Sequence, residues 1–219
     1  MSHQTELVFI LDKSGSMAGL ESDTIGGFNG FIEKQKKEEG DVRLTTVLFN
    51  NDIQLLHDRL DLKAIHPLTE NDYQVGGSTS LLDAIGFSIQ KIIQVQKQSS
   101  KAYRADKVIF VITTDGMENS SREFSVQKIK ALIEHQEQKY HWEFLFLGAN
   151  IDAISTANKM GIRTERAVEF FNDSKGIQTN YKVLNEAVSD LRSQKEIADK
   201  WKGEIERELA ARKMNKGKH

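Results

Sequence analysis

LVFILDKSGS, at residues 7–16, is an apolar run that ends in an acid and two alternate hydroxyls. Its first five residues are continuously apolar, as in a β-strand that is covered on both faces of a sheet. Asp12 follows the run directly, and Ser14 and Ser16 stand two and four positions further on. Because Gly15 gives the backbone freedom to curl, we interpret the stretch as a buried strand followed by a loop that gathers oxygen atoms around one point.

Further apolar runs alternate with helical patterns along the chain. The runs are LTTVLF at 44–49, VIFVIT at 108–113 and FLFLG at 144–148. Amphipathic helical patterns cover about 22–38, 81–97, 125–139 and 151–160. Such alternation predicts an α/β fold, a Rossmann-like three-layer sandwich in which a mostly parallel central sheet carries helices on both faces.

Two segments complete the predicted sheet, and a third follows it. IQLLHDRL at 53–60 comes so soon after 44–49 that we predict a hairpin turn at 50–52 and one antiparallel edge strand. AVEFF at 167–171 is predicted as the last short strand. Residues 173–219 are polar with helical spacing, which predicts one or two helices, the first packed on the domain. We therefore expect a domain over 1–172 and a C-terminal helical extension over 173–219.

Glycines in the first predicted helix need a reason, because each costs up to about 1 kcal/mol relative to alanine. They are Gly26, Gly27 and Gly30, and we expect them to allow a close approach of the helix to the sheet. The stretch fits neither GxGxxG nor a Walker sequence, so it is not predicted to hold phosphate.

Composition excludes several function classes. The 219 residues suffice for one domain with a sizeable core, and the net charge of −2 gives no attraction to nucleic acid or to an anionic membrane. The absence of cysteine excludes disulfides, thiolate zinc sites and cysteine nucleophiles. None of the six histidines has zinc-ligand spacing or accompanies a GxSxG motif. With neither a signal-like N-terminus nor an apolar run near the ~20 residues of a spanning helix, we expect a cytoplasmic protein with no membrane partner.

Residues with carboxylate and hydroxyl side chains are expected to lie together at one edge of the predicted sheet. Asp12 and Asp115 each follow an apolar strand, and GGST at 76–79 opens the helix at 81–97. In an open parallel sheet the carboxyl ends of the strands form the ligand-binding edge, so these loops are expected to meet there. Hydroxyls, water and few carboxylates form a hard oxygen site, which suits Mg²⁺ or Mn²⁺ better than zinc or copper.

Three motifs together resemble the von Willebrand factor type A domain and its metal-ion-dependent adhesion site. They are DKSGS at 12–16, GGST at 76–79 and TTDG at 113–116. The family pattern is Asp-x-Ser-x-Ser, a distant threonine before a helix, and a later aspartate after an apolar strand. The resemblance covers about 5–172 and extends to stand-alone intracellular bacterial and phage members.

The resemblance implies a set of metal ligands and a mode of action. Ser14, Ser16 and Thr79 would be direct ligands in the ligand-bound state, and Asp12 and Asp115 would act directly or through water. The implied cofactor is Mg²⁺ or Mn²⁺, with Ca²⁺ as a further candidate. Family members use the open coordination position to bind an acidic side chain of a partner protein, and they are usually binding modules rather than enzymes.

Each residue also has a plainer interpretation. Asp12 alone could be a loop acid, and Thr79 could be the N-cap of the 81–97 helix, a role that Ser78 or Ser80 could also fill. Ser80 is the main rival of Thr79 as a ligand. Asp83, one turn into the helix, is expected to support the helix start or its dipole.

Three functions remain open at this point. The first is a Mg²⁺-dependent protein-binding module. The second is a structural or assembly component that binds through the helices at 173–219. The third is a metal-dependent hydrolase, for which Glu118 is the candidate general base, although Glu118 and Asn119 are otherwise expected to lie in a solvated loop. A dehalogenase-type phosphatase is excluded, because it needs an acid where this chain has Ser14.

Overall fold

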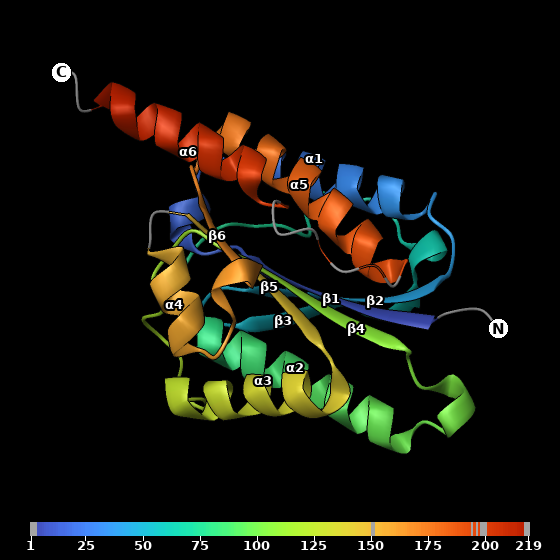
Figure 1. The fold of residues 1–219 in the computed structure, drawn as a ribbon. Coiled ribbons are helices and arrows are strands. Elements are labelled where there is room, and N and C mark those ends of the chain that lie inside the picture. The colour runs from blue at the N-terminus through green and yellow to red at the C-terminus, as the bar shows by residue number, and fades with distance from the viewer. Residues whose placement is uncertain (1–3, 150–151, 194, 196, 198–200, 217–219) are drawn as a thin grey trace.

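A six-stranded sheet runs through the centre of the molecule (Figure 1). The structure, a computed structural model, describes residues 4–149, 152–193, 195, 197 and 201–216. The strand order is β3-β2-β1-β4-β5-β6, which confirms the predicted α/β architecture. The strands are β1 (Gln4–Asp12), β2 (Asp41–Phe49), β3 (Ile53–Asp61), β4 (Lys107–Thr114), β5 (Glu143–Ala149) and β6 (Ala167–Phe170).

The pairing of the strands matches the prediction. β1 is parallel to both β2 and β4, and β5 pairs in parallel with β4 and with β6. β3 is antiparallel to β2 and forms one edge of the sheet. The hairpin turn between them is closed by the Asn50 amide, which donates to the Asp52 carbonyl at 3.0 Å. In return the Asp52 amide donates to Asn50 Oδ1 at 2.9 Å, so the predicted turn at 50–52 is confirmed.

Helices cover both faces of the sheet, as predicted (Figure 1). One layer contains α1 (Glu21–Gln35), α5 (Ser174–Arg192) and α6 (Gly203–Lys216). The other contains α2 (Leu81–Gln98), α3 (Val126–Tyr140) and α4 (Ala153–Lys159). The start of the fourth predicted helix, at residue 151, lies outside the described residues. Among the described residues, no helix combines the length and the apolarity that crossing a bilayer requires.

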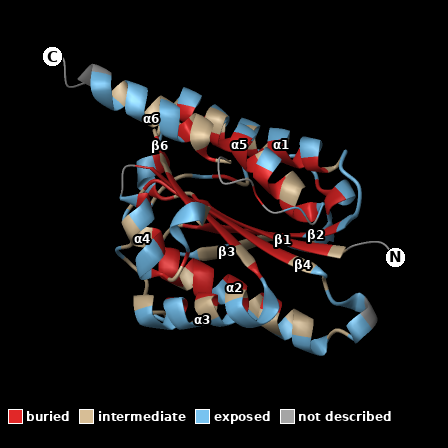
Figure 2. Ribbon diagram, viewed as in Figure 1, coloured by how far each residue is buried: buried red, intermediate tan, exposed pale blue. Residues whose placement is uncertain are grey.

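Alternate side chains along the strands of the sheet point into two separate hydrophobic cores. In β1, Phe9 and its neighbours at positions 7 and 11 pack with α1 and α5, whereas Val8 and Ile10 pack with α2, α3 and α4. This follows from the period of two along a strand. The inner strands are buried on both faces, which explains their continuously apolar sequences (Figure 2).

The helix α5 belongs to the first of these cores. Its apolar face buries Ile177, Tyr181, Leu184, Val188 and Leu191, each at most 7% exposed. This confirms the prediction that the first C-terminal helix packs on the domain. The boundary predicted at 172/173 stays a prediction.

The close approach at the glycines of α1 is to α5 rather than to the sheet. A Cβ on Gly27 would lie 2.2 Å from the Tyr181 ring, so a side chain there would push the two helices apart. Apart from the neighbouring backbone of α1 itself, no atom of the described residues lies within 4 Å of a Cβ built on Gly26 or on Gly30. The expectation of a helix–sheet contact was therefore wrong, because Tyr181 of α5 covers this part of α1.

Candidate metal centre

Two aspartates meet at the carboxyl edge of the sheet because β1 and β4 are adjacent. In the register of this pair Leu11 lies opposite Thr113, so the ends of both strands come together at Asp12 and Asp115. Asp12 is 1% exposed and Asp115 is 2% exposed. The sequence-based expectation that strand ends would bring these two carboxylates together is met by the topology.

Each oxygen of the Asp12 carboxylate has its own donor. The Ser14 amide donates to Oδ1 at 2.7 Å, and the Thr114 hydroxyl donates to Oδ2 at 2.6 Å. Burial raises the pKa of Asp12, and the hydrogen bonds from Ser14 and Thr114 partly offset that rise. The buried Tyr73 hydroxyl donates to the Asp12 carbonyl and fixes the backbone at this point. The acid is therefore held rigidly from three sides.

Asp115 is held in the same way by two different loops. The Ser16 hydroxyl donates to Oδ1 at 2.5 Å, and the side-chain amide of Asn172 donates to Oδ2 at 2.6 Å. Burial raises the pKa of Asp115, and the negative charge of Asp12 raises it further. Two buried carboxylates side by side repel each other, so a cation between them would lower the free energy of the pair.

Three hydroxyls converge on one point beside these carboxylates. Ser14 Oγ and Ser16 Oγ lie 3.1 Å apart. A Cβ built on Gly116 would lie 3.1 Å from Thr79 Oγ1, 3.2 Å from Ser16 Oγ and 3.9 Å from Ser14 Oγ. A small cradle lined by hydroxyl oxygens therefore exists because residue 116 has no side chain.

The cradle is built by contacts between loops that are far apart in the sequence. The Gly15 amide donates to the Gly77 carbonyl at 3.0 Å, and the Gly76 amide donates to the Lys13 carbonyl at 2.9 Å. Gly77 has a φ of +79°, and a Cβ there would lie 2.0 Å from Asn51 Oδ1. The positive φ favours glycine at this position, whereas the exposed Asn51 side chain could move aside.

Thr79, rather than its rival Ser80, presents a hydroxyl to the cradle. The Thr79 amide donates to Asn119 Oδ1 at 2.9 Å, and the Asn119 amide donates to the Thr79 carbonyl at 3.1 Å. The Ser80 hydroxyl instead donates to the Asn50 carbonyl. Ser80 is the N-cap residue of α2, although its side chain makes no capping hydrogen bond. The alternative interpretation of Thr79 as the N-cap was therefore wrong.

Two acidic side chains near the site accept hydrogen bonds from the loop that follows β4. The Glu118 carboxylate accepts from the amides of Leu82, Ser120 and Ser121, at 2.9, 3.0 and 2.7 Å. It also accepts from the Ser121 hydroxyl at 2.8 Å. Asp83 accepts from three consecutive amides at 122–124. Glu118 and Asn119 lie in a surface loop as expected, Asn119 exposed and Glu118 half-buried, but both also hold this loop in place by hydrogen bonds. Asp83 supports the loop as well, in addition to its place in the first turn of α2.

The cradle opens into a shallow hollow at the surface of the protein. The hollow has a volume of about 280 Å³ and is lined by the three residues whose hydroxyls border the cradle, with Met117 and Asn119 at its rim. Met117 is 75% exposed, so it adds an apolar surface beside the polar centre. No group of three His, Cys, Asp or Glu side chains that could hold a metal occurs in the described part of the chain. Any cation at this site would rely on hydroxyls as much as on carboxylates.

The residue types and their arrangement fit a hard divalent cation. Mg²⁺ and Mn²⁺ prefer oxygen ligands, and Mg²⁺ takes six of them in a near-octahedral arrangement at roughly 2.0–2.1 Å. Ser16 donates its proton to Asp115 and can therefore only accept in its 3.1 Å contact with Ser14, which leaves one lone pair of Ser16 Oγ for a cation. The cradle at Gly116 provides space bordered by three such oxygens.

Sequence reasoning missed the roles of several residues in this centre. They are Tyr73, Thr114, Gly116, Asn119 and Asn172. The strand-end rule could have found two of them, because Thr114 ends β4 and Asn172 closely follows β6 at the same edge. Tyr73 and Asn119 lie in irregular segments, where the sequence has no periodicity to guide a prediction.

A mostly parallel sheet, helices on both faces and a hydroxyl-rich centre at the carboxyl edge define the class of the molecule as a Rossmann-like α/β domain. The chain belongs to the von Willebrand factor type A domain family, whose sequence profile matches residues 6–190. Among curated protein sequences, none matches this chain.

Solved structures with the same fold come from distant organisms. A von Willebrand factor type A protein from Catenulispora acidiphila is 11% identical, with a TM-score of 0.59, over 86% of this chain and 43% of its own. The manganese-loaded TRAP protein of Plasmodium vivax is 22% identical, with a TM-score of 0.51, over 67% of this chain and 57% of its own. Proximal thread matrix protein 1 from the mussel byssus, with a zinc-occupied MIDAS motif, is 12% identical, with a TM-score of 0.54, over 84% and 48%.

The present chain spans about half the length of these structures. At such identities the likeness concerns the fold alone. Two of the neighbours hold a divalent metal, manganese in one and zinc in the other.

Proposed function

We propose that this chain is a protein-binding module that depends on a divalent cation, Mg²⁺ by preference. The proposal rests on the convergence of the hydroxyls of Ser14, Ser16 and Thr79 beside two buried carboxylates in an open hollow. These three side chains would ligate the cation, and Asp12 and Asp115 would hold it directly or through water. Mn²⁺ would bind in the same way, and Ca²⁺ would accept the same oxygen ligands with a larger radius.

Each protein group has a distinct part in this arrangement. The bound cation would supply positive charge that attracts an incoming carboxylate. Thr114 and Asn172 orient the two aspartates, and Asp115 in turn orients the Ser16 hydroxyl. Because these contacts exist in the folded chain, little reorganisation is needed when a cation enters.

A partner carboxylate is the ligand that best completes such a site. Hydroxyl ligands carry no charge, and the two carboxylates neutralise the two charges of the cation only in a formal sense. A cation that is ligated mostly by hydroxyls therefore keeps a strong attraction for a further anion. The cradle faces the open hollow, so an aspartate or glutamate of another protein has access from solvent. Met117, at the rim, offers that partner an apolar contact next to the charged one.

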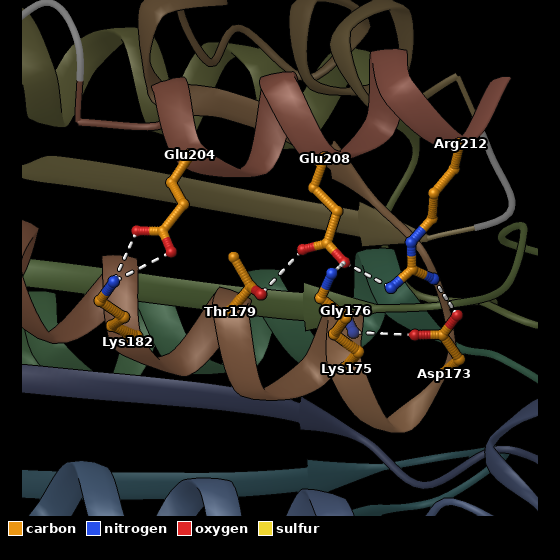
Figure 3. Close-up of polar contacts among 8 residues, drawn as sticks. All are labelled: Asp173, Lys175, Gly176, Thr179, Lys182, Glu204, Glu208 and Arg212. Carbon is orange, nitrogen blue, oxygen red and sulfur yellow. Dashed lines mark hydrogen bonds and ion pairs between the residues drawn. The ribbon is translucent and has the colours of Figure 1, made fainter. Parts of the chain in front are cut away.

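The two alternative functions have less support. A hydrolase needs a free general base beside the cation, and the Glu118 carboxylate already accepts four hydrogen bonds from its own loop and from α2. Assembly through the C-terminal helices needs a free helix surface. The faces that α5 and α6 turn toward each other are already joined by polar contacts within the chain (Figure 3), so such assembly would have to use their outer surfaces, where Glu206 and Arg207 are exposed.

Cation affinity provides the first test. Calorimetric titration with Mn²⁺ and Mg²⁺ should detect one site, and Thr79→Ala should weaken affinity on the order of 10- to 100-fold. Ser78→Ala is the matched control, because Ser78 lines the same hollow outside the cradle. Equal affinity in Thr79→Ala and in the unchanged protein would contradict the assignment.

Partner binding provides the second test. Proteins that bind the unchanged chain in Mg²⁺ should be lost both on chelation with EDTA and in the Thr79→Ala variant. Changing the contacting Asp or Glu of such a partner to Asn or Gln should abolish binding. A complex that survives these changes with unchanged affinity would show that recognition uses another surface.

A further inference from the structure

A larger hollow lies at the opposite edge of the sheet from the candidate metal centre. This groove, here called the amino-edge groove, has a volume of about 640 Å³. It lies between the C-terminal parts of α2 and α3 and the starts of β4 and β5. Its floor contains Val108, Leu132 and Trp142, and its rim contains Lys97, Arg104 and Lys139. Small-molecule sites in proteins typically occupy about 300–1,000 Å³, so the groove has a suitable size.

The floor of the amino-edge groove is apolar and rigid. Trp142 is 5% exposed, and its ring stacks on Phe110 with 5.6 Å between the ring centroids. Val108 is 3% exposed, and it begins the buried part of β4. A flat apolar group would find a preformed surface here, because the tryptophan is held in place by the core behind it.

A nearly buried side-chain amide also lines the groove. Gln136 is 3% exposed and contributes to the lining. Its amide group offers both donors and an acceptor. A ligand with a polar atom beside its apolar body would have a hydrogen-bonding group of the protein within the groove.

The charges at the rim favour an anion. Lys97 and Lys139 are in the last turns of α2 and α3, where they also offset the partial negative charge of each helix C-terminus, about half a unit apiece. Arg104 is not needed for that purpose. Its Nε donates to the Ser99 carbonyl at 3.1 Å, which orients the guanidinium. The acid at the groove, Asp106, accepts from the Gln4 amide at 2.9 Å.

We propose that the amino-edge groove binds a small organic acid with an aromatic body. The aromatic body lies against Trp142, the acid group pairs with Arg104, and the Gln136 amide bonds to a polar atom between them. Arginine suits this role because its planar fork matches a carboxylate or sulfonate in two parallel hydrogen bonds. The site is independent of the cation, because it lies at the other end of the strands.

The aromatic sulfonate 1-anilinonaphthalene-8-sulfonate is a direct probe of this groove. The chain has two tryptophans, Trp142 and Trp201, so the Trp201→Phe variant leaves one reporter in the floor. Energy transfer from Trp142 to the bound probe should be saturable, with one probe per chain and a dissociation constant below 1 mM. EDTA and the Thr79→Ala change should leave it unaltered, which separates this test from that of the metal centre.

Two variants made in that background locate the probe. Arg104→Gln should raise the dissociation constant at least tenfold, since the charged partner of the sulfonate is lost. Gln136→Leu should also raise it, because the amide that bonds to the probe is lost, and thermal unfolding checks that this variant remains folded. Arg122→Gln is the matched control, an exposed arginine at the metal edge of the molecule.

The proposal fails if energy transfer is absent or does not saturate. It also fails if Arg104→Gln and Gln136→Leu both bind the probe as tightly as the Arg122→Gln control does. In either case the groove holds no site for an aromatic acid, and Lys97 and Lys139 only stabilise the helix ends.

Discussion

At the scale of single residues, the candidate metal centre depends on one position that lacks a side chain. Gly116 borders the hydroxyls of Thr79 and Ser16, and the space in front of it is the space that a cation would use. Its backbone φ is outside the left-handed region, so alanine could adopt the same backbone. The glycine is therefore needed for the space it leaves rather than for its conformation.

The Gly116→Ala change should weaken Mn²⁺ affinity by roughly tenfold or more, because a methyl group would compete with the cation for the cradle. The melting temperature without metal should change little, since the contacts of 3.1 and 3.2 Å are with the ends of flexible side chains. Calorimetric titration and thermal unfolding measure the two effects. Gly26→Ala is the control, because its Cβ would meet open space in α1. Unchanged Mn²⁺ affinity in Gly116→Ala would place the cation elsewhere.

A second residue-scale feature is an acid that is fully buried in β1. Glu6 is 0% exposed and is paired with Arg59, whose Nε lies 3.0 Å from Glu6 Oε2. Arg59 is in the edge strand β3 with a φ of 50°, a conformation that few residues other than glycine adopt. Burial raises the pKa of Glu6 to about 7, although the Arg59 charge opposes the rise.

The pKa of Glu6 leads to a pH prediction with a definite sign. Between pH 4.5, its ordinary pKa, and about 7, the unfolded chain has lost the Glu6 proton while the folded chain still holds it. Stability from this group therefore falls as pH rises through that window. The Glu6→Gln variant lacks this titration, so its stability relative to the unchanged protein should rise by roughly 3 kcal/mol from pH 4 to pH 8.

Denaturant unfolding at several pH values measures that difference. Other titrating groups, including Asp12 and Asp115, are common to both proteins and cancel in the comparison. A difference in unfolding free energy that stays constant from pH 4 to pH 8 would refute the raised pKa.

At the scale of elements, α6 is joined to the rest of the chain by two kinds of contact. Polar contacts face α5: Lys182 with Glu204, Thr179 with Glu208, and Arg212 with Asp173 (Figure 3). Buried contacts lie at and just before the start of α6: Ile205 is 2% exposed, and Lys202 Nζ donates to the carbonyls of Thr164 and Ala167 at 2.9 and 2.8 Å. Because exposed ion pairs contribute little, the buried contacts should dominate.

Ile205→Ala should therefore destabilise the protein by roughly 2–4 kcal/mol, through lost burial and the cavity left behind. Lys182→Ala should cost much less, because its pair with Glu204 is half exposed. Chemical unfolding compares the two variants, and hydrogen exchange of the amides at 203–216 reports on local opening. A larger loss in Lys182→Ala than in Ile205→Ala would show that the polar contacts hold α6.

At the scale of the whole molecule, the predictable parts of the fold are those with a period. The inner strands and α1 to α4 follow from continuous apolar runs and helical spacing, and the sheet edge then places Asp12, Ser14, Ser16, Thr79 and Asp115 in one region. The supporting contacts of Tyr73 and Asn119 could not be predicted, because they come from aperiodic segments. The partner of Gly27 was also unpredictable from sequence, since α5 lies about 150 residues further along the chain.

The sequence predicts that residues 1–172 form a domain by themselves, and the packing of α5 allows this to be tested. Five buried side chains of α5 complete one core, and burying each contributes roughly 1.5–3 kcal/mol, so their sum approaches the whole stability of a typical domain. The family match, residues 6–190, also extends almost to the end of α5. We therefore expect a chain that ends at residue 172 not to fold, and a chain that ends at Ser193 to remain folded.

The two truncated chains also separate the proposed function from assembly through the C-terminal helices. The chain ending at Ser193 retains Asn172 and the cradle, and no described residue of α6 lines the hollow. Its Mn²⁺ affinity should therefore stay within about twofold of the full chain's, although it loses the contact of Arg212 with Asp173. Circular dichroism and gel filtration report on folding and oligomeric state, and calorimetry reports on the cation. If this chain bound Mn²⁺ normally but lost a partner that the full chain binds, recognition would belong to α6. If the chain ending at residue 172 folded and bound Mn²⁺, α5 would be an appendage, because the sheet would then keep its core without the five side chains that cover it here.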